Sequence, residues 1–233
     1  MLRVLNVKTF AVAAILGASL LAPTPASADP LLFERFNNVS NLTAAGWVMT
    51  NNSSPAGTTG WFQGNPGVFT AQEGAPDSYI AANFLNADFG GVIDNWLMLP
   101  ELELNDGDTL SFYTRSSGVL PDNLEVRFSG AGASTNTANF SLNLAINPAF
   151  AGSGYPSDWT LFTVTLSGLG GPTNGRFAFR YFVPDSTNNG DYIGIDSVRV
   201  DPAPVPEPAS MTLLGIGLAS LGLRRFRQTR TNV

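Results

Sequence analysis

The central part of the sequence alternates between apolar and polar positions with a period of two. In DNLEVRFSG, Leu124, Val126 and Phe128 share one side, and the residues between them share the other. GRFAFRYFV repeats this alternation from Phe177 to Val183. Apolar residues at helical spacing do not persist for more than about one turn anywhere in this part of the chain. A period of two is typical of antiparallel strands with one buried face, so we expect an all-β domain.

The alternating segments predict about ten short antiparallel strands. They are 31–36, 46–50, 60–63, 78–83, 92–99, 108–117, 122–130, 160–168, 175–183 and 192–200. Turn-forming sequences such as NDGD at 105–108 separate them. Many strands without helices predict a β-sandwich, and a jelly roll is the expected arrangement. The stretch 130–156 is expected to be a long excursion across one end, or to be mobile in part.

The last expected strand breaks its own alternation. Ile193 and Ile195 share one face, whereas Val198 and Val200 fall on the other. Either both faces are buried there, or a β-bulge near Asp196 resets the phase. An acid beside a bulge in an apolar strand is also a place to look for a bound cation.

The beginning of the chain has the features of a signal peptide over residues 1–28. Basic residues precede the apolar stretch 10–22, and Ala26 and Ala28 provide the small side chains that signal peptidase accepts. Cleavage is expected before Asp29. An uncut N-terminal membrane helix is the alternative, but two prolines interrupt the end of the apolar stretch. The mature protein is therefore expected to be exported.

The end of the chain carries a second apolar run, at 209–223. It is flanked by Pro206, Glu207 and Pro208 on one side and by Arg224 and Arg225 on the other. A bilayer-spanning helix needs about 20 apolar residues, so this run predicts a short transmembrane helix. The positive-inside rule places 224–233 in the cytoplasm. Prolines make 202–208 a stiff spacer between this helix and the predicted domain at 29–201.

Composition excludes several functions for the predicted domain. Between residues 29 and 204 there are six Arg, no Lys and seventeen Asp or Glu, which gives a net charge near −11 and makes nucleic acid an unfavourable partner. The chain has no Cys and no His. Disulfides, zinc sites with nitrogen or sulfur ligands, and catalysis by Ser-His-Asp or Cys-His groups are therefore excluded.

Several motifs together resemble the choice-of-anchor J domain of bacterial surface proteins, which is related to the cleaved-adhesin and MAM-like jelly rolls. They are FERF at 33–36, GWVMTN at 46–51, GWFQG at 60–64, DSYIAANF at 77–84, DNWLMLPELEL at 94–104, LSFYTR at 110–115, DNLEVRFS at 122–129 and DYIGIDSVRV at 191–200. The resemblance implies a jelly-roll sandwich on an exported protein and implies no enzymatic activity. A structural or adhesive role is the expectation.

The same resemblance implies a structural calcium ion between the first and last strands. Carried over to this sequence, it points to Glu34 and Asp196, with Asp77 as a third acid. Calcium takes six to eight oxygen ligands, so backbone carbonyls would have to complete the set. The alternative is that Glu34 faces solvent and that Asp196 caps a turn or pairs with an Arg.

Aromatic and acidic residues suggest two further functions. Trp61 and Trp96 are candidates for a platform that stacks on sugar rings, in a module that recognises exopolysaccharide. Packing within the sandwich is the favoured interpretation of these residues and of Trp47 and Trp159. Glu101 and Glu103 have the spacing of a glycosidase pair, but solvated surface acids are the favoured interpretation.

The C-terminal segment as a whole resembles the PEP-CTERM sorting signal. Its parts are the Pro206-Glu207-Pro208 triplet, the short apolar run and the basic cluster that begins with Arg224 and Arg225. The resemblance implies recognition by an exosortase, cleavage near the triplet and delivery from an inner-membrane intermediate to the cell surface or extracellular matrix of a Gram-negative-type bacterium. A simple tail anchor is the alternative.

Overall fold

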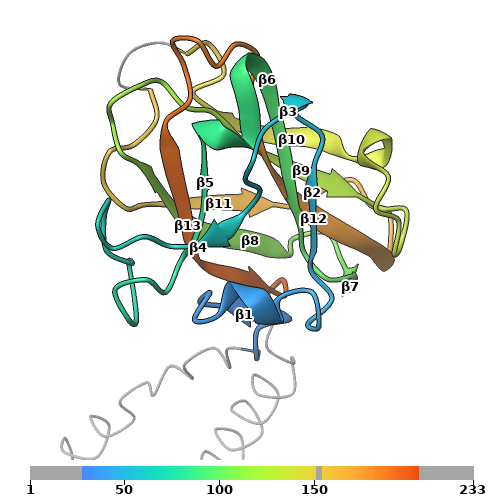
Figure 1. Ribbon diagram of the computed structural model, residues 1–233. Coiled ribbons are helices and arrows are strands. Elements are labelled where there is room, and N and C mark those ends of the chain that lie inside the picture. Colours follow the sequence, from blue (N-terminus) through green and yellow to red (C-terminus); the bar gives the residue numbers. More distant parts are fainter. Residues whose placement is uncertain (1–27, 151–153, 205–233) are drawn as a thin grey trace, which may run out of the picture. The chain divides into compact units, whose positions relative to one another are not determined.

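The computed structural model describes residues 28–150 and 154–204, which form two antiparallel β-sheets with a shared core (Figure 1). The smaller sheet has the order β11-β8-β13-β5-β4, and β1 also pairs with β13. Its strands are β1 (Leu32–Glu34), β4 (Phe62–Gln63), β5 (Ile80–Asn83), β8 (Thr109–Ser116), β11 (Thr160–Thr165) and β13 (Tyr192–Asp201).

The larger sheet has the order β10-β9-β12-β6-β2, with β3 paired to β6 and β7 paired to β12. Its strands are β2 (Val48–Asn51), β3 (Ser54–Ala56), β6 (Ala87–Met98), β7 (Leu102–Leu104), β9 (Leu124–Ser129), β10 (Ser141–Ile146) and β12 (Thr173–Val183). Among the described residues, three short 3-10 helices lie in the connections: η1 (Val39–Asn41), η2 (Phe84–Asn86) and η3 (Thr137–Asn139). The prediction of an antiparallel β-sandwich is confirmed, and the chain crosses repeatedly between the sheets, as in a jelly roll.

All ten predicted strands are present, and β3, β7 and β10 are additional. The predicted long excursion over 130–156 contains a strand that was not predicted, because β10 forms in its middle part and pairs with β9. Gly, Ser, Thr and Asn dominate the residues just before β10 and hide its short alternating pattern. An edge strand needs only one hydrogen-bonded neighbour, so a weak sequence pattern is sufficient here.

The inward-facing residues of the two sheets form the main hydrophobic core. From the larger sheet, β12 contributes Phe177, Phe179 and Tyr181 to it, all of them fully buried. Phe112 of β8 meets Phe179 with ring centroids 4.8 Å apart in an edge-to-face arrangement. The alternation seen in the sequence therefore corresponds to the division between core and outer face.

The predicted bulge in β13 is confirmed. The pairing of β13 with β8 shifts register between Asp196 and Arg199, and Ser197 has a φ of 49°. This shift turns Val198 toward the core after Ile195, and both side chains are fully buried. A one-residue insertion in the ladder thus explains the change of phase in the sequence.

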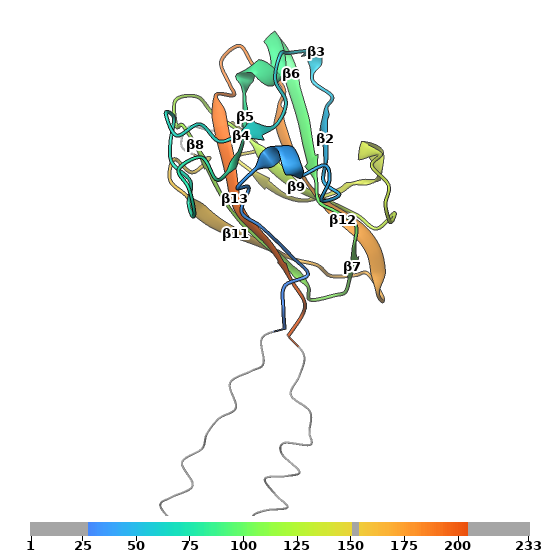
Figure 2. The same cartoon turned by 60° about the horizontal axis from the view of Figure 1, so that its bottom comes forward.

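The first and last strands of the described domain lie side by side. β1 pairs with the C-terminal half of β13, and the backbone N–H of Leu31 donates to the carbonyl of Val200 over 2.8 Å (Figure 2). At the other end of β13, the N–H of Phe84 donates to the carbonyl of Asp191. The connections around η2 and the start of β6 therefore lie at the end of the sandwich that is distant from Leu31 and Val200 (Figure 1).

No helix within the described ranges is long and apolar enough to cross a bilayer. The predicted transmembrane segment 209–223 lies outside those ranges.

Candidate functional site

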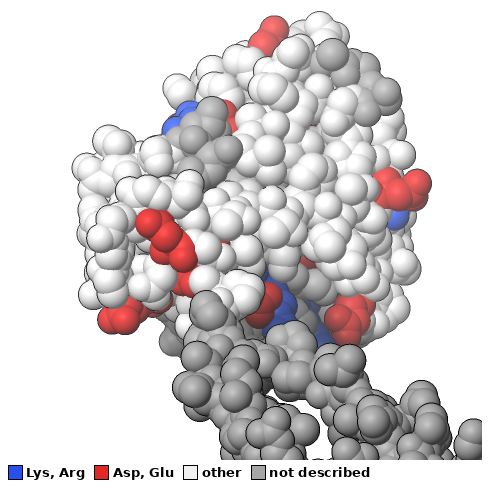
Figure 3. Space-filling view, turned by 180° about the vertical axis from the view of Figure 1, so that it is seen from behind, with Lys and Arg blue, Asp and Glu red and all other residues white. Residues whose placement is uncertain are grey.

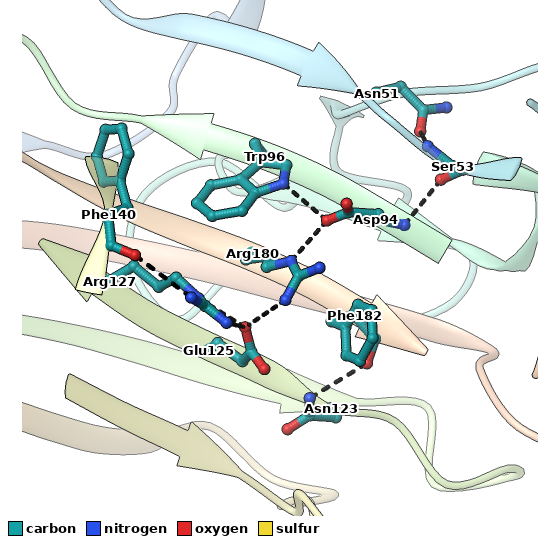
Figure 4. Close-up of polar contacts among 10 residues, drawn as sticks. All are labelled: Asn51, Ser53, Asp94, Trp96, Asn123, Glu125, Arg127, Phe140, Arg180 and Phe182. Carbon is teal, nitrogen blue, oxygen red and sulfur yellow. Dashed lines mark hydrogen bonds and ion pairs between the residues drawn. The ribbon is translucent and has the colours of Figure 1, made fainter. Parts of the chain in front are cut away.

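Polar side chains are concentrated on the outer face of the larger sheet. β12 lies between β6 and β9, and the register places Arg180 directly opposite Trp96 on one side and Glu125 on the other. Residues that are paired across a ladder share a face, so these three side chains project away from the core. Asp94 lies two residues before Trp96 on β6 and therefore on the same face (Figure 4).

Four charged residues on this face form a continuous ion-pair network. The Nε of Arg180 donates to Oδ1 of Asp94 over 2.6 Å, and its Nη1 donates to Oε2 of Glu125 over 3.1 Å. Arg127 reaches the same Oε2 of Glu125 through Nη2, at 2.7 Å. All four side chains are more than three-quarters buried. Shared carboxylates in a partly desolvated network hold the side chains in one geometry.

Trp96 lies within this network. Its indole N–H donates to Oδ1 of Asp94 over 2.7 Å, and the Arg180 guanidinium lies 5.2 Å from its ring centroid. Phe140, from the connection before β10, packs against the ring with centroids 5.7 Å apart. Arg127 donates to the carbonyl of Phe140 and so fixes this contact (Figure 4). The result is that Trp96 is only 3% exposed.

The chemistry of the network is that of a structural element. Burial acts to lower the pKa of Arg180, but the carboxylates of Asp94 and Glu125 outweigh it, so the pKa is raised above its ordinary value. Arg180 therefore stays charged, and each carboxylate is matched by a guanidinium. The network fixes the shape of this sheet face and offers neither a free acid nor a free base.

The predicted tryptophan platform is not present on the surface. Trp61 is 7% exposed and belongs to the main core, whereas Trp96 is on the outer face of the larger sheet. The two rings are therefore in different hydrophobic clusters, and neither presents an open face for a sugar ring. Packing accounts for both residues.

A second polar cluster is buried near the start of β13 and was not predicted from the sequence. Oδ1 of Asp122 accepts hydrogen bonds from the Tyr181 hydroxyl, over 2.6 Å, and from the N–H of Asp191, over 2.9 Å. Burial raises the pKa of Asp122 to about 7, although both hydrogen bonds act in the opposite direction. The same burial raises the pKa of Tyr181. In sequence, PDN before a strand is typical of an exposed turn, which conceals the burial of Asp122.

The three acids of the predicted calcium site have separate partners. Oε1 of Glu34 accepts the N–H of Phe36 over 2.7 Å. Asp196 is fully buried and accepts the N–H groups of Gln72, Glu73 and Ser197. Burial raises the pKa of Asp196 to about 6, against the effect of these donors. The side-chain oxygens of Asp196 thus fix the loop that contains Gln72 to the bulge of β13.

Asp77 is exposed, and a neutral side chain binds its backbone. Nε2 of Gln63 donates to the carbonyls of Asp77, over 2.5 Å, and Phe36, over 2.8 Å. This amide joins two of the segments that a cation was predicted to bridge. In the parts of the chain that the structure describes, no three acidic side chains gather as a metal-binding group. The predicted carboxylates do not form a joint ligand set, and calcium binding stays a prediction.

Chelation tests the calcium prediction. When the free ion is present at about 100 times its Kd, its binding stabilises the folded state by roughly 2.7 kcal/mol. For a domain of this size, EDTA should then lower the melting temperature by about 5 to 10 °C, as measured by differential scanning calorimetry with and without added CaCl₂. An identical melting temperature in both buffers would rule out a structural calcium site.

The remaining predicted site residues are exposed or outside the described ranges. Glu101 and Glu103 are both exposed beside β7, as expected of solvated surface acids. Ala28 is the first described residue and is exposed, whereas Ala26 lies outside the described ranges. The sorting residues also lie outside them: Pro206, Glu207, Pro208, Arg224 and Arg225. Figure 3 shows a face of the domain on which charged side chains are few and scattered, without a continuous basic surface.

Comparison with protein families supplies the function of the C-terminal segment. A family model described as the PEP-CTERM protein-sorting motif matches residues 204–227. The C-terminal segment therefore carries a PEP-CTERM sorting motif. The match includes every residue that the sequence predicted for sorting, from Pro206 to Arg225. A PEP-CTERM motif marks an exported protein that an exosortase sorts to the cell surface.

Solved structures show the fold of the domain that precedes this motif. The K1 cleaved adhesin domain of Lys-gingipain from Porphyromonas gingivalis matches with a TM-score of 0.53 and 22% identity, covering 73% of this chain and 97% of that domain. The K3 domain matches with a TM-score of 0.51 and 22% identity, covering 75% and 99%. A search of curated proteins found no match. The predicted adhesin-like β-sandwich is therefore confirmed as a fold.

Proposed function

We propose that this PEP-CTERM protein is a non-catalytic structural or adhesive module of the cell surface or extracellular matrix. The observation that carries the proposal is the sorting motif, which starts at Pro204, three residues after the end of β13. An exosortase would cut near the Pro206-Glu207-Pro208 triplet while the run 209–223 holds the protein in the inner membrane. The released product would consist of the β-sandwich with a short Pro-rich extension.

The polar clusters of the domain support a role without catalysis. The carboxylates of Asp94 and Glu125 are paired with guanidinium groups. Those of Asp122 and Asp196 accept hydrogen bonds from the folded chain itself. In each case the acid has a partner within the folded domain itself.

The ends of the domain support surface display. Because β1 and the end of β13 are paired, the attachment through Pro204 is made at one end of the sandwich, and the opposite end is directed away from it (Figure 2). This arrangement suits a module that presents its distant loops to its surroundings.

Mass spectrometry of the mature protein tests the sorting. Protein recovered from the cell surface should contain no peptide from beyond about Pro208. A Glu207→Gln variant should keep its complete C-terminus and accumulate in the inner-membrane fraction, because the exosortase no longer recognises the altered triplet. Glu101→Gln is the matched control, since Glu101 is an exposed acid of the domain, and it should be processed as the unaltered protein is. Surface delivery of the Glu207 variant without its tail would contradict the proposal.

A further inference from the structure

Large apolar side chains are exposed at the end of the sandwich that is distant from Pro204. Phe89 is 84% exposed, Phe84 47% and Leu85 42%. They line a groove of about 360 Å³, together with Ala56, Gly57, Thr58, Ala87, Asp88 and Ser186. This volume is within the range of roughly 300 to 1,000 Å³ that is typical of ligand pockets. Exposed apolar clusters with polar residues at their edge mark sites of interaction.

The floor of the groove is rigid. η2 carries Phe84 and Leu85 outward, while Asn86, which ends it, is fully buried. The carbonyl of Asn86 accepts hydrogen bonds from the N–H of Gly57, over 3.0 Å, and from Nδ2 of Asn51, over 2.8 Å. Its side chain accepts a further hydrogen bond from Asn95 of β6. The backbone that carries Phe84 and Leu85 is thus held in place before any ligand arrives, which lowers the entropic cost of binding.

The two walls of the groove are in direct contact below it. A Cβ atom at Gly57 would lie 2.0 Å from the carbonyl oxygen of Leu85, so only glycine allows this approach. On the other side, the N–H of Ser186 donates to the carbonyl of Gly91 over 3.0 Å, which joins the connection after β12 to β6. The groove is therefore built by three separate segments of the chain that hydrogen bonds and close packing hold together.

The polar groups at the groove match a hydroxyl-rich ligand. Asp88 is exposed and charged, and the hydroxyl groups of Thr58 and Ser186 lie in the same lining. A sugar ring has an apolar face, which stacks on an aromatic ring, and hydroxyl groups at its edge, which donate to carboxylates. Phe89 and Phe84 provide the aromatic surfaces, and Asp88 provides the acceptor.

Charge distinguishes between the partners that this surface could bind. The residues that line the groove include an acid and no Lys or Arg. An acidic polymer would be repelled by Asp88, and a second copy of the chain would bring a second Asp88 against the first. An uncharged glycan meets neither repulsion.

From these observations we propose that the groove around Phe84, Phe89 and Asp88 binds an uncharged polysaccharide. Phe84 of the groove is hydrogen-bonded to Asp191, next to the start of β13. The ten residues of β13 then span about 30 Å, at roughly 3.3 Å per residue, toward the end where Pro204 leaves the domain. The protein thus holds a glycan at one end and is attached through its tail at the other. The inference rests on the proposed adhesive function and names the partner of the adhesion.

Affinity electrophoresis of the mature protein tests this site. The gels contain a soluble β-glucan, a galactomannan or a xylan as uncharged probes, and alginate as the acidic probe. Migration should be slowed by at least one uncharged polymer and not by alginate. Phe89→Ala should raise the Kd at least tenfold, and Asp88→Asn should weaken binding in the same gel. Leu161→Ala removes a side chain that is 52% exposed on β11, outside the groove, and should bind as the unaltered protein does.

Several results would overturn the inference. They are slowed migration that Phe89→Ala does not change, slowing by alginate alone, no slowing by any uncharged polymer, and self-association in sedimentation experiments that Phe89→Ala abolishes. Phe89 is too exposed for its truncation to unfold the domain, and equal melting temperatures verify this. Failure here is distinguishable from failure of the proposed sorting, because the mass of the mature C-terminus reports on the sorting without reference to any glycan.

Discussion

The mature protein should be more resistant to urea at pH 5 than at pH 8, because its folded state holds a proton on Asp122. Burial raises the pKa of this carboxyl from 3.8 to about 7. Between these two values the folded protein binds a proton that the unfolded chain has lost, so the free energy of unfolding falls as the pH rises. At about 1.36 kcal/mol per pKa unit, the whole loss from pH 3.8 upward is at most roughly 4 kcal/mol. About 2.7 kcal/mol of it falls above pH 5, and it is complete a little above pH 7.

Asp122→Asn separates this effect from the rest of the molecule. The amide oxygen can still accept from the Tyr181 hydroxyl and the N–H of Asp191, but the side chain has no charge to desolvate at any pH. The variant should be more stable than the unaltered protein at pH 8 and should lose most of the pH dependence above pH 6. Urea titrations followed by tryptophan fluorescence at pH 5, 6, 7 and 8 measure both.

Two comparisons make the result specific to Asp122. Asp158→Asn removes a carboxylate whose side chain is 95% exposed, and it should leave the pH profile unchanged. Burial also raises the pKa of Asp196, to about 6, so a smaller slope below pH 6 should persist in Asp122→Asn. A profile that stays as steep in Asp122→Asn as in the unaltered protein would show that Asp122 is not the group that titrates.

Removing Arg180 should destabilise the domain by about 3 kcal/mol, which is the low end of the cost of breaking a buried ion pair. Arg180→Met keeps most of the aliphatic volume but leaves Asp94 without its guanidinium and takes one of the two from Glu125. The indole of Trp96 also loses the cation above its ring. Urea titration measures the stability, and near-ultraviolet circular dichroism should show a weaker tryptophan signal.

Arg199 provides a control at a more exposed position, where the guanidinium pairs with Asp201 on the same strand. Its ion pair with Asp201 is about one-third exposed, whereas the Arg180 side chain is 16% exposed. Arg199→Met should therefore cost less than 1 kcal/mol. Adding Asp94→Asn to Arg180→Met should recover part of the loss, because the unpaired carboxylate is then gone. Equal losses for Arg180→Met and Arg199→Met would mean that the network adds nothing beyond a surface pair.

The strands were predictable from the sequence because alternation follows burial on one face of a sheet. The bulge in β13 was predictable for the same reason, since the change of phase between Ile195 and Val198 has a direct cause in the shifted register. β10 was missed because an edge strand among small polar residues leaves little pattern. Local sequence thus determines which segments are strands but says little about the neighbours of each strand.

The outer-face network could not be predicted, because its members are far apart in the sequence. Arg180 is 86 residues from Asp94 and 55 residues from Glu125, and only the order β9-β12-β6 brings them together. Alternation placed Glu125 and Arg127 on one face without showing what faced them. The groove at Phe84 and Phe89 was missed for a similar reason. It is formed by three separate segments of the chain, and the packing of both sheets determines how close these segments lie to one another.

The position of β13 determines when the smaller sheet can form during synthesis. The last strand to leave the ribosome lies in the middle of the smaller sheet, between β8 and β5, and it also pairs with β1 at the beginning of the domain. Until β13 arrives, β1 has no partner in the described sheets, and β8 and β5 have none on their facing sides. Contacts this distant in sequence form late, so the smaller sheet cannot be completed until β13 is free to pair, which is after nearly the whole described domain has been made.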